Sequence, residues 1–105
     1  MSNDDRRIVI YVTYVGEPSD RFDRAYYEET HLPLVLRAWK KYGLLGATAY
    51  FPSRSHTGTR CICECVFRNE TAVHTAFASP EAPFVMADVI KFTDLLPIRV
   101  HAVPL

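Results

Sequence analysis

The chain is predicted to be a single α+β domain, residues 1–105, with the ferredoxin-like element order βαββαβ and a four-stranded antiparallel sheet. Three observations predict this class. Short apolar segments of strand character alternate with two longer segments of helical periodicity in that order. The 105 residues, of which 49% are hydrophobic, suffice for one modest core. A polar N-terminal segment, residues 1–7, precedes the first strand.

The first strand is expected at Ile8–Val15, an almost continuously apolar segment rich in β-branched residues and typical of a strand buried on both faces. Apolar side chains then recur at helical spacing over residues 19–42, with Ser19 or Asp20 as the N-terminal cap. Pro33 interrupts this pattern, because it lacks a donor N–H and crowds a preceding carbonyl group. The helix should therefore kink or restart near this proline.

The second half of the chain supplies the other elements. Asn69 and Pro80 are typical of helix starts. Pro97 stands before the last strand, where proline is tolerated. The expected strands and helices are Leu44–Phe51, Arg60–Arg68, 70–78, 80–94 and Ile98–Val103.

Three cysteines, Cys61, Cys63 and Cys65, alternate along one strand and so point to one face. Successive side chains on that face are about 6.6 Å apart, which favours buried reduced thiols over disulfides. A metal site would need these thiols to converge. No zinc-spaced Cys/His set, phosphate-binding glycine loop or nucleophile elbow is present, so we expect no metal and no tightly bound cofactor.

Charge and hydropathy exclude several classes of partner. The formal net charge is zero, which offers no electrostatic footprint for nucleic acid. No apolar run approaches the roughly 20 residues needed to span a membrane. The polar start is unlike a signal peptide, so a cytoplasmic location is expected.

The first strand carries apolar side chains on both faces, although right-handed crossovers place both helices on one side of the sheet. The second face would then be an exposed apolar surface in a monomer. We therefore predict a homodimer in which two sheets meet face to face.

Glu64, Arg99 and His101 could share one face of the sheet if the strand registers agree. Two interpretations are open for such a group. It could be an ion-pair network at the dimer interface, or a second polar cluster with chemistry of its own.

Two blocks of sequence resemble the signatures of a known family. The first is Phe22-Asp23-Arg24-Ala25-Tyr26-Tyr27 followed by His31-Leu32-Pro33-Leu34-Val35, and the second is Ala78-Ser79-Pro80-Glu81, Val85-Met86-Ala87-Asp88 and Phe92-Thr93-Asp94. Together they resemble the EthD family. The resemblance implies a dimeric α+β barrel associated with degradation or tailoring of small molecules, with biochemical activities that are mostly unassigned.

His31 and Tyr27 are the candidate catalytic residues. They lie one helical turn apart near the predicted kink, and His31 matches the family's His-x-Pro motif. An imidazole can exchange a proton near neutral pH, and a phenol can donate to a developing oxyanion. Alternatively, His31 satisfies a carbonyl freed by Pro33. The candidate substrate-binding residues are aromatic or apolar: Tyr26, Trp39, Phe84, Met86 and Phe92.

Three functional hypotheses follow. The first is a small-molecule enzyme, resembling an oxidoreductase of the monooxygenase type or a cyclase, that transfers protons on a hydrophobic or aromatic compound. The second is a non-catalytic ligand-binding protein or accessory protein of an oxidase. The third is haem binding through His31, as in some barrels of this fold.

Overall fold

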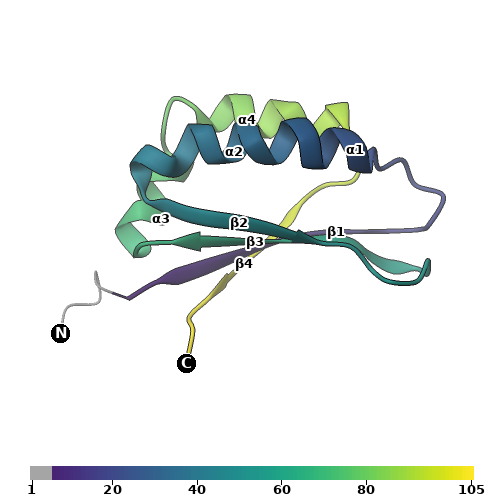
Figure 1. Ribbon diagram of the computed structural model, residues 1–105, viewed down its shortest axis with the longest axis horizontal. Coiled ribbons are helices and arrows are strands. Elements are labelled where there is room, and N and C mark those ends of the chain that lie inside the picture. The colour runs from purple at the N-terminus through teal and green to yellow at the C-terminus, as the bar shows by residue number, and fades with distance from the viewer. Residues whose placement is uncertain (1–5) are drawn as a thin grey trace.

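The computed structural model describes residues 6–105 and contains one four-stranded sheet with helices on one face (Figure 1). Residues 1–5 of the predicted polar segment lie outside the described residues. The elements are β1 (Ile8–Gly16), α1 (Arg24–Tyr26), η2 (Tyr27–His31), α2 (Leu32–Trp39), η3 (Lys40–Tyr42), β2 (Leu44–Tyr50), β3 (Gly58–Phe67), α3 (Glu70–Phe77), α4 (Ala82–Asp88), η4 (Val89–Lys91) and β4 (Ile98–Ala102).

The sheet has the strand order β2-β3-β1-β4, and every neighbouring pair is antiparallel. This arrangement confirms the predicted ferredoxin-like α+β fold. The thiols of Cys61, Cys63 and Cys65 are buried on the face that the helices cover, opposite Tyr14, Val12 and Ile10 of β1 respectively.

The first helical segment is interrupted close to the predicted place. Residues Tyr27–His31 form a π-helical turn, in which the Leu32 N–H donates to the carbonyl oxygen of Tyr27. Pro33 occupies the first turn of α2, where its missing N–H leaves no donor unsatisfied. A π-helical turn widens the helix locally and often occurs at functional sites.

Two predicted helix starts were wrong by a few residues. Asp23, rather than Ser19 or Asp20, caps the first helix by accepting from the Tyr26 N–H at 3.1 Å. Helix α4 begins at Ala82 instead of Pro80, because residues 79–81 form a turn in which the Ala82 N–H donates to the Ser79 carbonyl oxygen at 3.2 Å.

Aromatic rings fill the layer between helices and sheet. Tyr14, Tyr27 and Phe92 are almost completely buried and meet edge to face at centroid distances of 5.0 to 6.2 Å. Such geometry is favourable, and full burial of one large apolar side chain contributes about 1.5–3 kcal/mol. This packing fixes the floor beneath η2.

The opposite face of the sheet has no helix over it within residues 6–105 (Figure 1). Tyr50, Ile98 and Val100 point to this face and are each about half exposed, at 53%, 51% and 52%. None of the described helices is long and apolar enough to cross a membrane.

Candidate functional site

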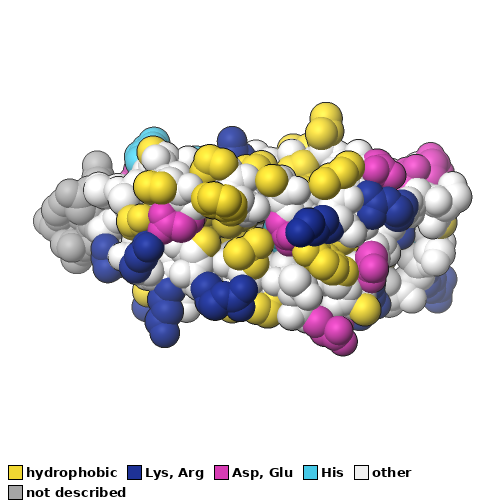
Figure 2. Space-filling view, turned by 90° about the horizontal axis from the view of Figure 1, so that it is seen from above, with side chains coloured by type: hydrophobic (Ala, Val, Ile, Leu, Met, Phe, Trp, Pro, Cys, Tyr) yellow, Lys and Arg dark blue, Asp and Glu magenta, His cyan; other side chains and the backbone are white. Residues whose placement is uncertain are grey.

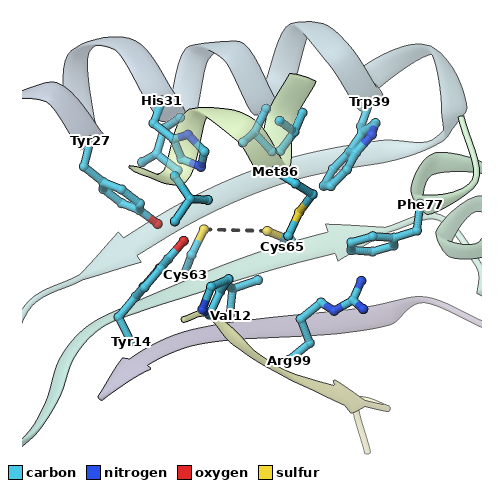
Figure 3. Close-up of a pocket in the computed structure, with 15 residues that line it drawn as sticks. Val12, Tyr14, Tyr27, His31, Trp39, Cys63, Cys65, Phe77, Met86 and Arg99 are labelled. Atoms are coloured by element: carbon cyan, nitrogen blue, oxygen red, sulfur yellow. Dashed lines mark hydrogen bonds between the residues drawn. The ribbon is translucent and has the colours of Figure 1, made fainter. Parts of the chain in front are cut away.

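A cavity of about 50 Å³ lies between the helices and the sheet (Figure 3). Helical segments form its roof and β1 and β3 form its floor. Exposed side chains of Met86 and Arg99 also line it, so it opens between α4 and β4. The lining is largely apolar: Val12, Tyr14, Tyr27, His31, Leu32, Val35, Trp39, Cys63, Cys65, Phe77, Val85, Met86, Val89, Pro97 and Arg99.

His31 is held at the cavity wall by Asp88. Nδ1 of His31 lies 2.9 Å from Oδ2 of Asp88, and both side chains are at least nine-tenths buried. Tyr26 donates its hydroxyl to the other carboxylate oxygen at 2.6 Å, and the Lys91 ammonium lies 3.9 Å from that oxygen. The carboxylate is therefore fixed by partners from three helical elements, α1, η2 and η4.

The protonation states follow from this environment. Burial alone would raise the pKa of Asp88, but the hydrogen bonds from Tyr26 and His31 outweigh it and hold that pKa below its ordinary value. Burial lowers the pKa of His31, although Asp88 acts in the opposite direction. At neutral pH Asp88 is thus an ionised acceptor, so His31 Nδ1 must carry the proton and Nε2 the lone pair. Within residues 6–105, Nε2 has no hydrogen-bond partner.

Two phenols and a thiol converge at the floor of the cavity. The hydroxyls of Tyr14 and Tyr27 point toward Cys63 in Figure 3. Burial raises the pKa of both tyrosines, so they remain protonated donors.

The thiols of Cys63 and Cys65 lie 3.6 Å apart. The hydrogen bond with Cys65 lowers the pKa of Cys63, whereas burial raises the pKa of Cys61 to about 12. The floor therefore adds polar hydrogens to an otherwise apolar cavity.

The predicted substrate-binding residues divide into three groups. Trp39 and Met86 line the cavity. Tyr26 and Phe92 lie behind His31, with the Phe92 ring centroid 4.7 Å from that of the imidazole. The prediction is wrong for Phe84, which is 72% exposed on the outer side of α4, because Val85 takes the inward position. Figure 2 looks down on the helix layer and shows exposed apolar side chains among charged ones.

Glu64, Arg99 and His101 do not form the cluster that a shared face would allow. Glu64 of β3 is the cross-strand neighbour of Tyr11 of β1. On the uncovered face its carboxylate accepts a hydrogen bond from the Tyr11 hydroxyl at 3.0 Å. Arg99 and His101 face the helices, because they pair with Val12 and Ile10. The register of β4 against β1 thus separates the acid from the two basic side chains.

Sequence analysis missed Asp88 and Tyr14 as site residues. The available signal for Asp88 was an acidic side chain three residues after Val85, on the apolar side of a helix where charges are rarely buried without a partner. Tyr14 was visible only as part of an apolar strand.

Haem does not fit this site. An imidazole is a common haem ligand, but a cavity of about 50 Å³ is far below the roughly 300–1,000 Å³ of pockets that hold drug-sized ligands. A porphyrin would have to separate the helices from the sheet.

A family model for the EthD domain matches residues 17–96, a segment that contains both His31 and Asp88. The chain belongs to the EthD family. No curated protein matches this EthD sequence.

Solved structures share the fold of this EthD protein. An EthD-like protein from Ralstonia eutropha JMP134 has 19% identity and a TM-score of 0.82, covering 93% of this chain and 91% of that one. An ethyl tert-butyl ether D (EthD) family protein from Bacillus halodurans C-125 has 17% identity and a TM-score of 0.74, covering 94% and 99%. A candidate antibiotic biosynthesis monooxygenase from Caulobacter crescentus CB15 has 13% identity and a TM-score of 0.68, covering 98% and 93%.

Proposed function

We propose that this EthD protein binds a small, largely apolar carbonyl compound in the cavity and that His31 transfers a proton on it. The observation that carries this proposal is the 2.9 Å bond between Asp88 and Nδ1 of His31 at the cavity wall. It leaves Nε2 as a base, and the carboxylate stabilises the imidazolium formed when Nε2 takes up a proton.

The hydroxyls at the cavity floor complete the proposed chemistry. Removal of a proton from a carbon next to a carbonyl group places negative charge on the carbonyl oxygen. Tyr27, with Tyr14 beside it, can donate a hydrogen bond to that oxygen. Donors held in a water-poor cavity stabilise such charge more strongly than donors in bulk water do.

An enolate is the shared starting point for a cyclisation and for an oxidation. The proposed proton transfer could therefore serve either a cyclase-like or a monooxygenase-like activity. Likeness in fold to the candidate monooxygenase from Caulobacter crescentus supports the second alternative at the level of architecture.

Hydrogen exchange at carbon tests the proposal without knowledge of the natural substrate. 2-Butanone, a ketone small enough for a cavity of about 50 Å³, is incubated with the protein in deuterium oxide, and loss of its methylene signal is followed by proton NMR. We expect the wild type to accelerate exchange and His31→Gln to lower that acceleration by about 100-fold or more. His74→Gln, at an exposed position on α3, is the matched control and should exchange as wild type. Equal exchange by wild type and His31→Gln would refute a basic role for His31.

The largely apolar lining also favours a second candidate, a binding protein without catalysis. Trp39 is the single tryptophan and lines the cavity, so its indole N–H resonance reports occupancy. Ligand-dependent shifts of this resonance without any exchange at carbon would support binding alone.

We further propose that the uncovered sheet face binds a second copy of the chain. Tyr50, Ile98 and Val100 expose apolar surface there, and a self-complementary contact would bury it. The cavity lies on the other side of the sheet and stays open in such a homodimer.

A further inference from the structure

Among residues 6–105, Arg99 is the only lysine or arginine that lines the cavity. It extends from β4 toward Phe77 of α3 (Figure 3), and its guanidinium carbon lies 4.5 Å from the centre of the Phe77 ring. Within residues 6–105 no carboxylate forms an ion pair with it. The charge at the cavity mouth is therefore held by an aromatic ring and lacks an anionic partner among these residues.

The carboxylate of Glu70 lies close to two histidines and forms no ion pair with Arg99. Glu70 lies 3.1 Å from Nε2 of His74 and 4.0 Å from Nδ1 of His101. These two histidines, Phe77 and Arg99 also line a shallow hollow of about 350 Å³ outside the cavity. Because Phe77 and Arg99 line both spaces, Arg99 stands where the inner cavity meets the outer hollow.

We infer that Arg99 forms a subsite for a carboxylate, so that the ligand is a small apolar acid. This inference rests on the proposed function and specifies its substrate class: the apolar body enters the cavity toward His31, and the carboxylate remains at the mouth. A guanidinium presents paired N–H donors that match the two oxygens of a carboxylate. The Phe77 ring orients those donors toward the cavity mouth.

A pair of probes that differ only in charge tests this subsite. Isobutyrate and isobutyramide share a carbon skeleton small enough for a cavity of about 50 Å³, and their binding can be followed by NMR titration of the Trp39 indole N–H resonance. We expect wild type to bind the acid about tenfold more tightly than the amide, as a charge-assisted pair is stronger than a neutral one. Arg99→Gln should lose this preference and bind the amide as wild type does. Arg99→Lys should keep part of the preference.

Arg37→Gln is the matched control, because Arg37 is exposed on α2 and its loss removes the same charge away from the cavity. This variant should keep the full preference for the acid. Equal affinity of wild type for acid and amide, with Trp39 shifted by both, overturns the carboxylate subsite and leaves the cavity as a binding site. Loss of both ligands in a folded Arg99→Gln protein assigns Arg99 a structural role and also overturns it. Absence of any Trp39 shift with either probe overturns both this subsite and the proposed function.

Discussion

Oδ2 of Asp88 lies 2.9 Å from Nδ1 of His31, and this bond joins residues 57 positions apart in the sequence. It links the end of α4 to the π-helical turn before α2 and so closes the helix layer over the cavity. The same contact sets the tautomer of the imidazole, so it contributes both to packing and to the proposed chemistry.

Asp88→Asn should separate these two contributions. An amide keeps the size of the side chain but cannot stabilise an imidazolium, and it can bind His31 in the wrong tautomer. We expect carbon exchange to fall by about 100-fold and the pKa of His31 to drop further, because Asp88 raises it in the wild type. An NMR titration of the His31 ring measures this pKa. Asp94→Asn removes an exposed carboxylate that pairs with Arg21, and this control should leave the pKa of His31 unchanged. An unchanged His31 pKa in Asp88→Asn would contradict the assignment of Asp88 as the partner of His31.

Acid should destabilise the fold in part through His31. Its pKa is lowered in the folded protein, so below about pH 6.5 the unfolded chain takes up a proton that the folded chain resists. The free energy of unfolding then decreases as the pH falls from 7 to 5, by at most about 1.4 kcal/mol per pH unit from this group. Urea unfolding across this range should show a shallower decrease for His31→Gln. Parallel curves for the two proteins would show that burial of neutral His31 contributes nothing.

Asp88 acts in a lower pH range. Its pKa is lowered, so its contribution to stability is complete above about pH 4 and is lost as the pH falls through the folded value.

Tyr26→Phe should weaken the support of Asp88 while keeping the ring. The variant loses the 2.6 Å hydrogen bond to Oδ1, which raises the pKa of Asp88 and leaves that oxygen short of a donor. We expect the melting temperature to fall by about 5 °C and carbon exchange to slow by a smaller factor than in Asp88→Asn. Ser53→Ala removes an exposed hydroxyl from the loop between β2 and β3 and should leave both quantities unchanged. Identical melting of the Tyr26 and Ser53 variants would show that the bond adds no stability.

Val100→Glu should convert the proposed homodimer into a monomer. The substitution places a charge on edge strand β4 of the uncovered sheet face, next to Tyr11 of β1, where a second copy would have to desolvate it. Light scattering after size exclusion measures the mass. Ile90→Glu, at an exposed apolar position on the helix side, should remain dimeric. A wild-type protein that is monomeric at all accessible concentrations would refute the homodimer.

Local patterns accounted for most of the fold. Alternation along β3 predicted that Cys61, Cys63 and Cys65 share a buried face, and Pro33 predicted the interruption of the first helix next to His31. Gly43, which directly follows that helical segment, has the left-handed φ of 110° that favours glycine. Each of these features depends on residues within a few positions of one another.

The amino-acid sequence by itself determined the order of the elements, the buried face of β3 and the placement of His31 near a broken helix, because periodicity and turn chemistry are local properties. Only the tertiary structure decided that Asp88 is the partner of His31, that Phe84 faces outward, and that Glu64 and Arg99 lie on opposite faces of the sheet. These outcomes depend on how α4 rotates against α2 and how β4 aligns with β1. Packing between distant segments sets both relationships, and no spacing within one segment specifies them.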